Sequence, residues 1–150
     1  MIRTVLTVTL AVAILAAAAP AIEDAQVQRT ETTLASDLQS VRAAATALTA
    51  SEDAIEPPAP GARRVVTVDL PRRDFSAAAV ESVHIDTEGL SYQIVEGPSD
   101  TIAFDTNAHI TVHPRGDHEA ITLTAAGRHR LSLSLRYVNT TRTIHIKRLE

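Results

Sequence analysis

Two adjacent stretches decide the fold: TVLTVTLAVAILAAAAPAI at residues 4–22 and EDAQVQRTETTLASDLQSVRAAATALTA at residues 23–50. The first contains 19 uncharged residues, and as a helix it would be roughly 28 Å long, close to the hydrocarbon thickness of about 30 Å. Arg3 precedes it, and Glu23 and Asp24 follow it. The positive-inside rule therefore predicts that residues 1–22 are a single-pass transmembrane anchor with a cytoplasmic N-terminus and an extracellular C-terminal domain.

A cleavable signal peptide is the alternative for residues 1–22. The short basic start, the apolar core and the small residues Ala19 and Ala21 all fit that class of segment. Pro20 at the expected cleavage region and the very short basic part favour the retained anchor. If residues 1–22 are removed, the rest of the chain is secreted.

Residues 23–53 are predicted to form a long amphipathic helix, with a kink at Pro20 where it joins the apolar segment. Apolar side chains recur at a heptad spacing and define a helix contact face: Val27, Leu34, Leu38, Val41 and Leu48, with Ala45 on the same stripe. We expect the turns near Val41–Leu48 to pack on the domain that follows. We expect Val27 and Leu34 to face helices of partner proteins or a second copy of this chain.

The remainder of the chain is predicted to be β structure after a Pro-rich linker at residues 54–62. Apolar and polar residues alternate within residues 63–150, which is typical of antiparallel strands that bury one face. The alternation lies in residues 66–70, 83–85, 90–94, 110–112, 121–123, 131–137 and 144–146. Short links from residue 108 onward predict a four-strand meander. The fold class is therefore α+β, with one small antiparallel sheet domain behind a long helix.

Composition excludes several classes of function. Cysteine is absent, so disulfides, thiolate metal sites and cysteine nucleophiles are excluded, and the net charge of −4 argues against a nucleic-acid binder. Only 3% of the residues are aromatic, so the core must consist of aliphatic side chains. The use of Arg rather than Lys, together with the acidic excess, is typical of a halophile with a GC-rich genome.

No residue pattern predicts catalysis. The densest group of potential metal ligands is His109, His113, Asp117 and His118, but His109 and His113 lie about 13 Å apart along a strand. We therefore expect no metal site, no cofactor and no enzymatic activity. Asn139 begins the sequence Asn-Thr-Thr in a predicted hairpin turn and is an expected N-glycosylation acceptor if the domain is extracellular.

The stretch Leu10–Ala25 resembles the N-terminal helix of type IV pilins and pseudopilins. In those proteins an apolar half with a proline kink continues into an amphipathic half that packs on a small β head. Arg3 stands alone near the start of this chain, whereas the pilin helix carries a glutamate there. The segments Met1–Ala25 and Pro60–Val68 also resemble an uncharacterised haloarchaeal family associated with type IV pilus or secretion-system genes.

Two functional hypotheses follow. The first is a non-enzymatic, membrane-anchored, pilin-like component of an archaeal surface or secretion apparatus, whose partners are the membrane and the helices of that apparatus. The alternative is a secreted or tethered β domain that acts as a binding module.

Overall fold

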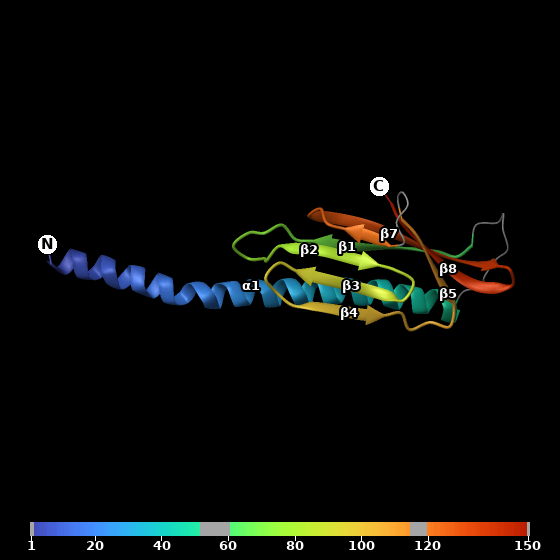
Figure 1. Cartoon of the computed structure of the whole chain (residues 1–150), viewed down its shortest axis with the longest axis horizontal. Coiled ribbons are helices and arrows are strands. Elements are labelled where there is room, and N and C mark those ends of the chain that lie inside the picture. The colour runs from blue at the N-terminus through green and yellow to red at the C-terminus, as the bar shows by residue number, and fades with distance from the viewer. Residues whose placement is uncertain (1, 52–60, 115–119, 150) are drawn as a thin grey trace.

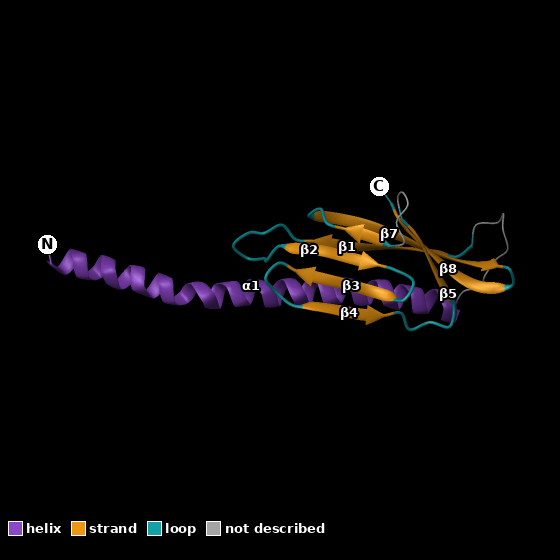
Figure 2. Cartoon of the chain, viewed as in Figure 1, coloured by secondary structure: helices purple, strands orange, loops and turns teal. Residues whose placement is uncertain are grey.

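Within the residues that the structure describes, a single helix precedes a domain of eight strands. The computed structural model describes residues 2–51, 61–114 and 120–149. Helix α1 extends over Ile2–Ser51, and its N-terminal half projects away from the β domain (Figures 1 and 2). Most of the predicted linker at residues 54–62, together with Asp117 and His118, lies outside the described residues.

Helix α1 passes through Pro20 without ending. Proline has no N–H and therefore removes one backbone hydrogen bond, which favours bending of a helix. Figure 1 shows the helix axis changing direction within its N-terminal half. In the apolar part, the hydroxyls of Thr7 and Thr9 donate to the carbonyls of Arg3 and Val5, each at 2.8 Å. These bonds satisfy both hydroxyls within the helix, so they carry no unpaired polar group into an apolar surrounding.

The strands form two four-stranded sheets. The first has the order β1 (Arg63–Leu70), β7 (Gly127–Val138), β8 (Thr141–Arg148) and β5 (His109–His113). The second has the order β4 (Ser99–Ala103), β3 (Gly89–Ile94), β2 (Val80–Ile85) and β6 (Ile121–Leu123). A long apolar helix followed by largely antiparallel sheets confirms the predicted α+β class.

The predicted meander from residue 108 onward is wrong. Strand β5 pairs with β8 in parallel, with Ile110 opposite Ile144, and β6 leaves that sheet to pair with β2. Only the β7–β8 hairpin has the connection that a meander requires. Alternation identifies the buried face of a strand, but it is the same for every pairing that buries that face.

Strand β4 was not predicted from the sequence. It lies at the edge of the second sheet and pairs only with β3. Of its five residues only Ile102 is buried, so the sequence SDTIA contains too few apolar positions to show an alternation. Polar composition of this kind is common in edge strands, where it discourages pairing with other chains.

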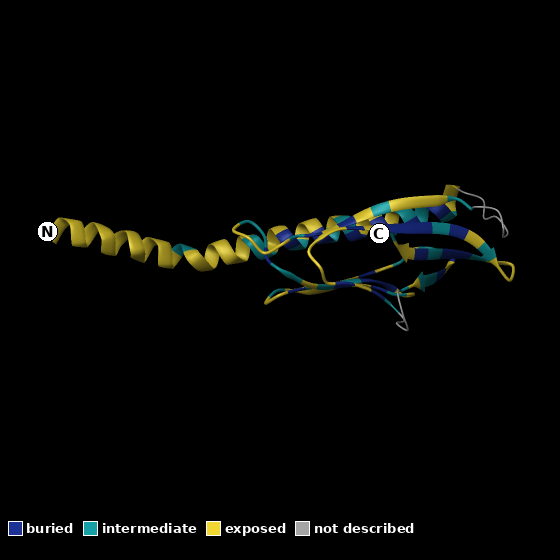
Figure 3. Ribbon diagram, turned by 90° about the horizontal axis from the view of Figure 1, so that it is seen from above, coloured by how far each residue is buried: buried dark blue, intermediate teal, exposed yellow. Residues whose placement is uncertain are grey.

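The core lies between the apolar faces of the two sheets and the C-terminal half of α1. The sheets contribute aliphatic side chains, including Val68, Leu133 and Ile146 from the first and Val83, Leu90 and Leu123 from the second. Helix α1 contacts β1 and β7 of the first sheet and β3 and β4 of the second. Figure 3 shows the buried residues of α1 confined to the part that lies on the domain.

Candidate functional site

The heptad stripe of α1 packs into the core of the β domain. Leu34, Leu38, Val41 and Leu48 are completely buried, and Ala45 is almost so. Thr30 is the one polar residue among the buried positions of the helix, and it lies one turn before Leu34. The helix is therefore an integral part of the domain's core over about five turns.

The expectation that Leu34 faces a partner is wrong, because the β domain covers more of the helix than the sequence indicated. Val27 also packs against the core, although it is only partly buried. A Cβ placed on Gly97, in the β3–β4 turn, would lie 3.2 Å from Cγ1 of Val27. The turn therefore approaches the helix so closely that no partner helix fits over Val27 on that side.

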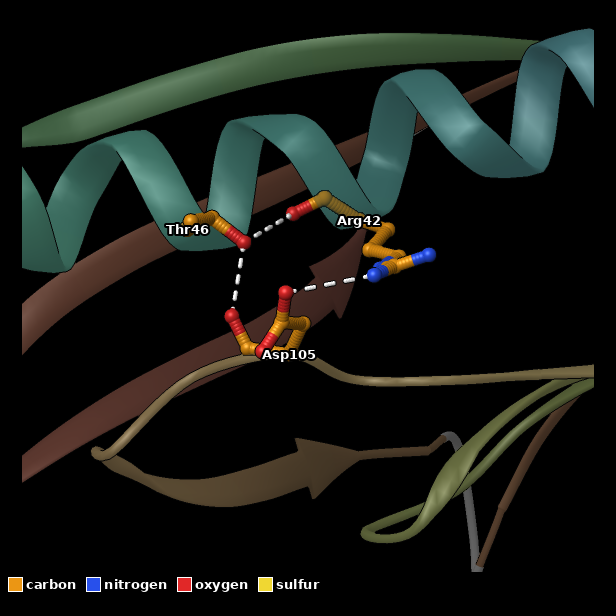
Figure 4. A network of polar contacts seen from close by, with 3 residues as sticks. All are labelled: Arg42, Thr46 and Asp105. Carbon is orange, nitrogen blue, oxygen red and sulfur yellow. Dashed lines mark hydrogen bonds and ion pairs between the residues drawn. The ribbon is translucent and has the colours of Figure 1, made fainter.

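Polar contacts hold the C-terminal end of the helix to the loop after β4 (Figure 4). The Arg42 guanidinium forms an ion pair with the Asp105 carboxylate at 3.2 Å, and the Thr46 hydroxyl donates to the Asp105 carbonyl at 2.8 Å. Both side chains of the ion pair are substantially exposed, so the pair contributes only about 0–1 kcal/mol. These contacts fix the position of the helix relative to the loop after β4 and add little to the free energy of unfolding.

A second group of polar contacts lies nearer the apolar half of the helix. The Thr30 hydroxyl accepts a hydrogen bond from the Ala78 N–H at 3.0 Å and donates to the Ala78 carbonyl at 3.4 Å. One turn earlier, the Gln26 side-chain amide donates to the Phe75 carbonyl at 2.9 Å. The contacts between helix and domain therefore begin at Gln26.

The N-terminal half of α1 has no contact surface within the described chain. Its large apolar side chains, among them Ile2, Leu6, Leu15 and Ile22, are 52–85% exposed. This segment is long and apolar enough to span a membrane, and a signal sequence near an N-terminus satisfies the same criterion. The uncovered apolar half is the feature of the molecule that most requires a partner, because water solvates such a surface poorly.

Two of the histidines, His113 and His145, form a hydrogen-bonded and stacked pair that was not predicted from the sequence. Nε2 of His113 on β5 lies 2.6 Å from Nδ1 of His145 on β8, and the two rings stack with centroids 4.9 Å apart. Burial, assisted by the nearby His113 and Arg136, lowers the pKa of His145. A shared hydrogen bond requires at least one neutral ring, which agrees with this direction.

The described residues contain no cluster of three or more His, Asp or Glu side chains able to hold a metal ion. His109 is exposed on β5 and does not join the pair, and His118 lies outside the described residues. The pairing of His113 with His145 could not be predicted from the sequence, because it depends on the parallel β5–β8 register.

A hollow of about 390 Å³ beside His113 is lined by Ile121, Thr122 and Arg148, among others. It contains no arrangement of an acid, a base and a nucleophile among its described lining residues.

The predicted glycosylation acceptor Asn139 is exposed in the β7–β8 turn. Asn139 and Thr140 have φ values of 48° and 67°, and the flanking Val138 and Thr141 are paired across the hairpin. Two central residues with positive φ define a type I′ turn. This turn lies at the end of the domain opposite the apolar half of α1 (Figure 1).

These features define a class of protein with one N-terminal helix, apolar in its first half and built into a small α+β head in its second half. This architecture fits pilin-like proteins. The chain belongs to the family of the domain of unknown function DUF7311, whose model matches residues 1–149. No curated protein and no solved structure matches it.

Proposed function

We propose that this protein is a non-enzymatic, membrane-anchored, pilin-like component of an archaeal surface or secretion apparatus. The observation that supports the proposal is the division of α1 into two halves. The C-terminal half completes the core of the β domain, whereas the N-terminal half is uncharged and uncovered over residues 4–22. An apolar helix that projects from a folded head is suited to a bilayer or to packing among similar helices.

The orientation in this proposal has the β domain outside the cell. Arg3 on one side of the apolar span and Glu23 and Asp24 on the other support a cytoplasmic N-terminus. The exposed Asn139, at the end of the head farthest from the span, would then be accessible to glycosylation (Figure 1).

The partners in this proposal are helices of other membrane components, which contact the apolar half of α1 rather than its heptad stripe. Leu34 and Leu38 are already buried by the head, so the uncovered surface available to a partner lies before Gln26. Small side chains dominate the run Ala16–Ala19, which permits close approach of a second helix. Assembly would therefore occur at membrane depth, with the heads arranged outside.

Topology and retention can be tested together in intact cells that express the full chain with a C-terminal epitope. We expect the protein to remain in the membrane fraction after alkaline carbonate extraction, and added protease to remove the epitope and degrade residues 61–150. Full protection of the head would contradict the orientation. Release of a chain that begins near residue 20 or 22 would support the secreted binding module instead, since the contacts between helix and head begin only at Gln26.

A further inference from the structure

The end of the β domain from which the apolar half of α1 emerges carries an exposed aromatic side chain. Phe75, in the β1–β2 loop at residues 71–79, is 89% exposed, more than any other large hydrophobic side chain that the structure describes. Figure 1 shows this loop extending toward the N-terminal half of the helix. The hydrogen bond from Gln26 to the Phe75 carbonyl holds the loop against the helix at that level.

The loop is an ordered turn and not a loose connection. The Asp74 N–H donates to the Ala77 carbonyl at 3.1 Å. The N–H and the hydroxyl of Ser76 both donate to Oδ1 of Asp74, at 2.7 and 2.8 Å. These bonds also lower the pKa of Asp74. The Phe75 ring is therefore presented to the surroundings by a turn that its own hydrogen bonds hold in shape.

Two cations precede the aromatic residue. Arg72 and Arg73 are exposed, and neither has a hydrogen bond or an ion pair with another described residue. A hollow of about 140 Å³ separates Arg73 from acidic residues of the helix and the β3–β4 turn, namely Glu23, Asp24 and Glu96. The loop thus adds two exposed guanidinium groups to this end of the head, where the acids Glu23, Asp24 and Glu96 lie across the hollow from Arg73.

The position of the loop along the helix corresponds to the headgroup region of a bilayer. If the apolar span ends at Ile22, Gln26 lies roughly 6 Å beyond it at 1.5 Å per residue. The headgroup layer extends over about that distance outside the hydrocarbon core. Phenylalanine side chains of interfacial segments enter the boundary between headgroups and acyl chains, and arginine binds lipid phosphate there.

We propose that the β1–β2 loop is a second membrane contact, in which the Phe75 ring enters the interface and Arg72 and Arg73 bind the phosphates of anionic lipids. The inference rests on the anchor of the proposed function. It adds that the head is held against the bilayer rather than free to pivot on its helix. Two contacts with one surface restrict the head to one orientation.

The absence of tryptophan from the chain allows a direct test. The full-length Phe75→Trp variant is reconstituted into vesicles of phosphatidylcholine and phosphatidylglycerol, with or without lipids brominated near the headgroup end of their acyl chains. We expect its emission to shift to shorter wavelength and to be quenched by the brominated lipid. The control is Val138→Trp, at a partly exposed position beside the distal β7–β8 turn, which should show neither effect.

The contribution of charge is tested in the Phe75→Trp background. Arg72→Gln/Arg73→Gln should reduce the quenching in anionic vesicles, whereas Arg64→Gln/Arg136→Gln, which removes two exposed arginines farther from the β1–β2 loop, should not. An equal loss from both pairs would contradict the assignment of the arginines. Quenching at position 75 no greater than at position 138, in protein that resists carbonate extraction, would overturn the second contact and leave the anchor intact. Protein that carbonate removes would overturn the anchor, and with it this inference.

Discussion

Thr140 occupies a backbone conformation that a β-branched residue rarely adopts. Its φ of 67° lies in the left-handed region, and it is the second central residue of the β7–β8 turn. Glycine is the usual residue there, because it has no Cβ to approach the following carbonyl. The hairpin therefore forms in spite of Thr140, stabilised by the long pairing of β7 with β8.

Replacement of Thr140 by Gly should stabilise the domain by about 1 kcal/mol, since it removes the cost of the left-handed conformation. The measurement is chemical unfolding of the full chain in a mild detergent, followed by near-ultraviolet circular dichroism of the buried Tyr92. Thr140→Ala is the matched control, because it removes the β-branch but keeps Cβ. Equal stabilisation by both substitutions would show that the branch, and not the backbone conformation, is responsible.

His145 should make the stability of the domain depend on pH. Its folded-state pKa is lowered from the ordinary value of 6.5 by burial and by nearby positive charge, so the unfolded chain binds the proton more readily. The free energy of unfolding should therefore decrease as the pH falls below about 6.5, until the folded-state pKa is reached. Unfolding curves between neutral and mildly acidic pH would measure this.

His145→Gln should flatten that part of the stability profile. His109→Gln, at an exposed position of the neighbouring strand β5, should leave it unchanged. A profile that keeps its slope in the His145→Gln variant would assign the acid sensitivity to another group.

At the level of elements, the amphipathic half of α1 behaves as part of the β domain's core and not as a free coiled-coil strand. Leu34 is the position that distinguishes the two possibilities, because it lies near the start of the buried stripe. Its side chain is completely inaccessible in the single chain. No partner is needed to bury it.

Leu34→Ala should lower the free energy of unfolding of the head by about 2–5 kcal/mol, the usual cost of truncating a buried leucine. Leu15→Ala makes the same chemical change at a position that is 70% exposed, and it should leave unfolding of the head unaltered. Both variants can be compared by denaturant unfolding in detergent. A stable Leu34→Ala head that fails to associate with other membrane components would instead support the sequence-based expectation that partners use this residue.

At the level of the whole molecule, the two halves of the one helix belong to different environments. The hydrogen bonds and buried side chains that the structure describes between helix and domain involve residues from Gln26 onward, through Thr30 and Leu34 to Thr49. The long apolar surface lies before them. Folding of the head and attachment of the head to a membrane are therefore separable properties.

A chain that begins at Glu23 should consequently fold, with an unfolding midpoint close to that of the full-length protein, and should lose attachment to membranes. Thermal unfolding and vesicle flotation of the shortened and full-length chains measure the two properties. A substantially lower midpoint in the shortened chain would show that residues 1–22 contribute to the fold itself.

Sequence patterns alone predicted the helix, the α+β class and seven of the eight described strands, because each depends on local periodicity. The uncharged run at residues 4–22 is recognisable for the same reason, and so is the turn at Asn139. Strand β4 could not be predicted, because an edge strand with one buried residue shows no alternation of apolar and polar residues.

The tertiary structure decided which strands pair and which surfaces remain uncovered. The parallel β5–β8 register joins His113 to His145, and the transfer of β6 to the second sheet produces two layers instead of one meander. The heptad stripe predicted that α1 would bury one face. The same side chains would be buried whether the head or a partner helix covered that face. The two sheets bury Leu34, so the head and not a partner helix covers this position. The sequence could not show this, because the apolar area of a helix face determines how much surface is buried and not which neighbour buries it.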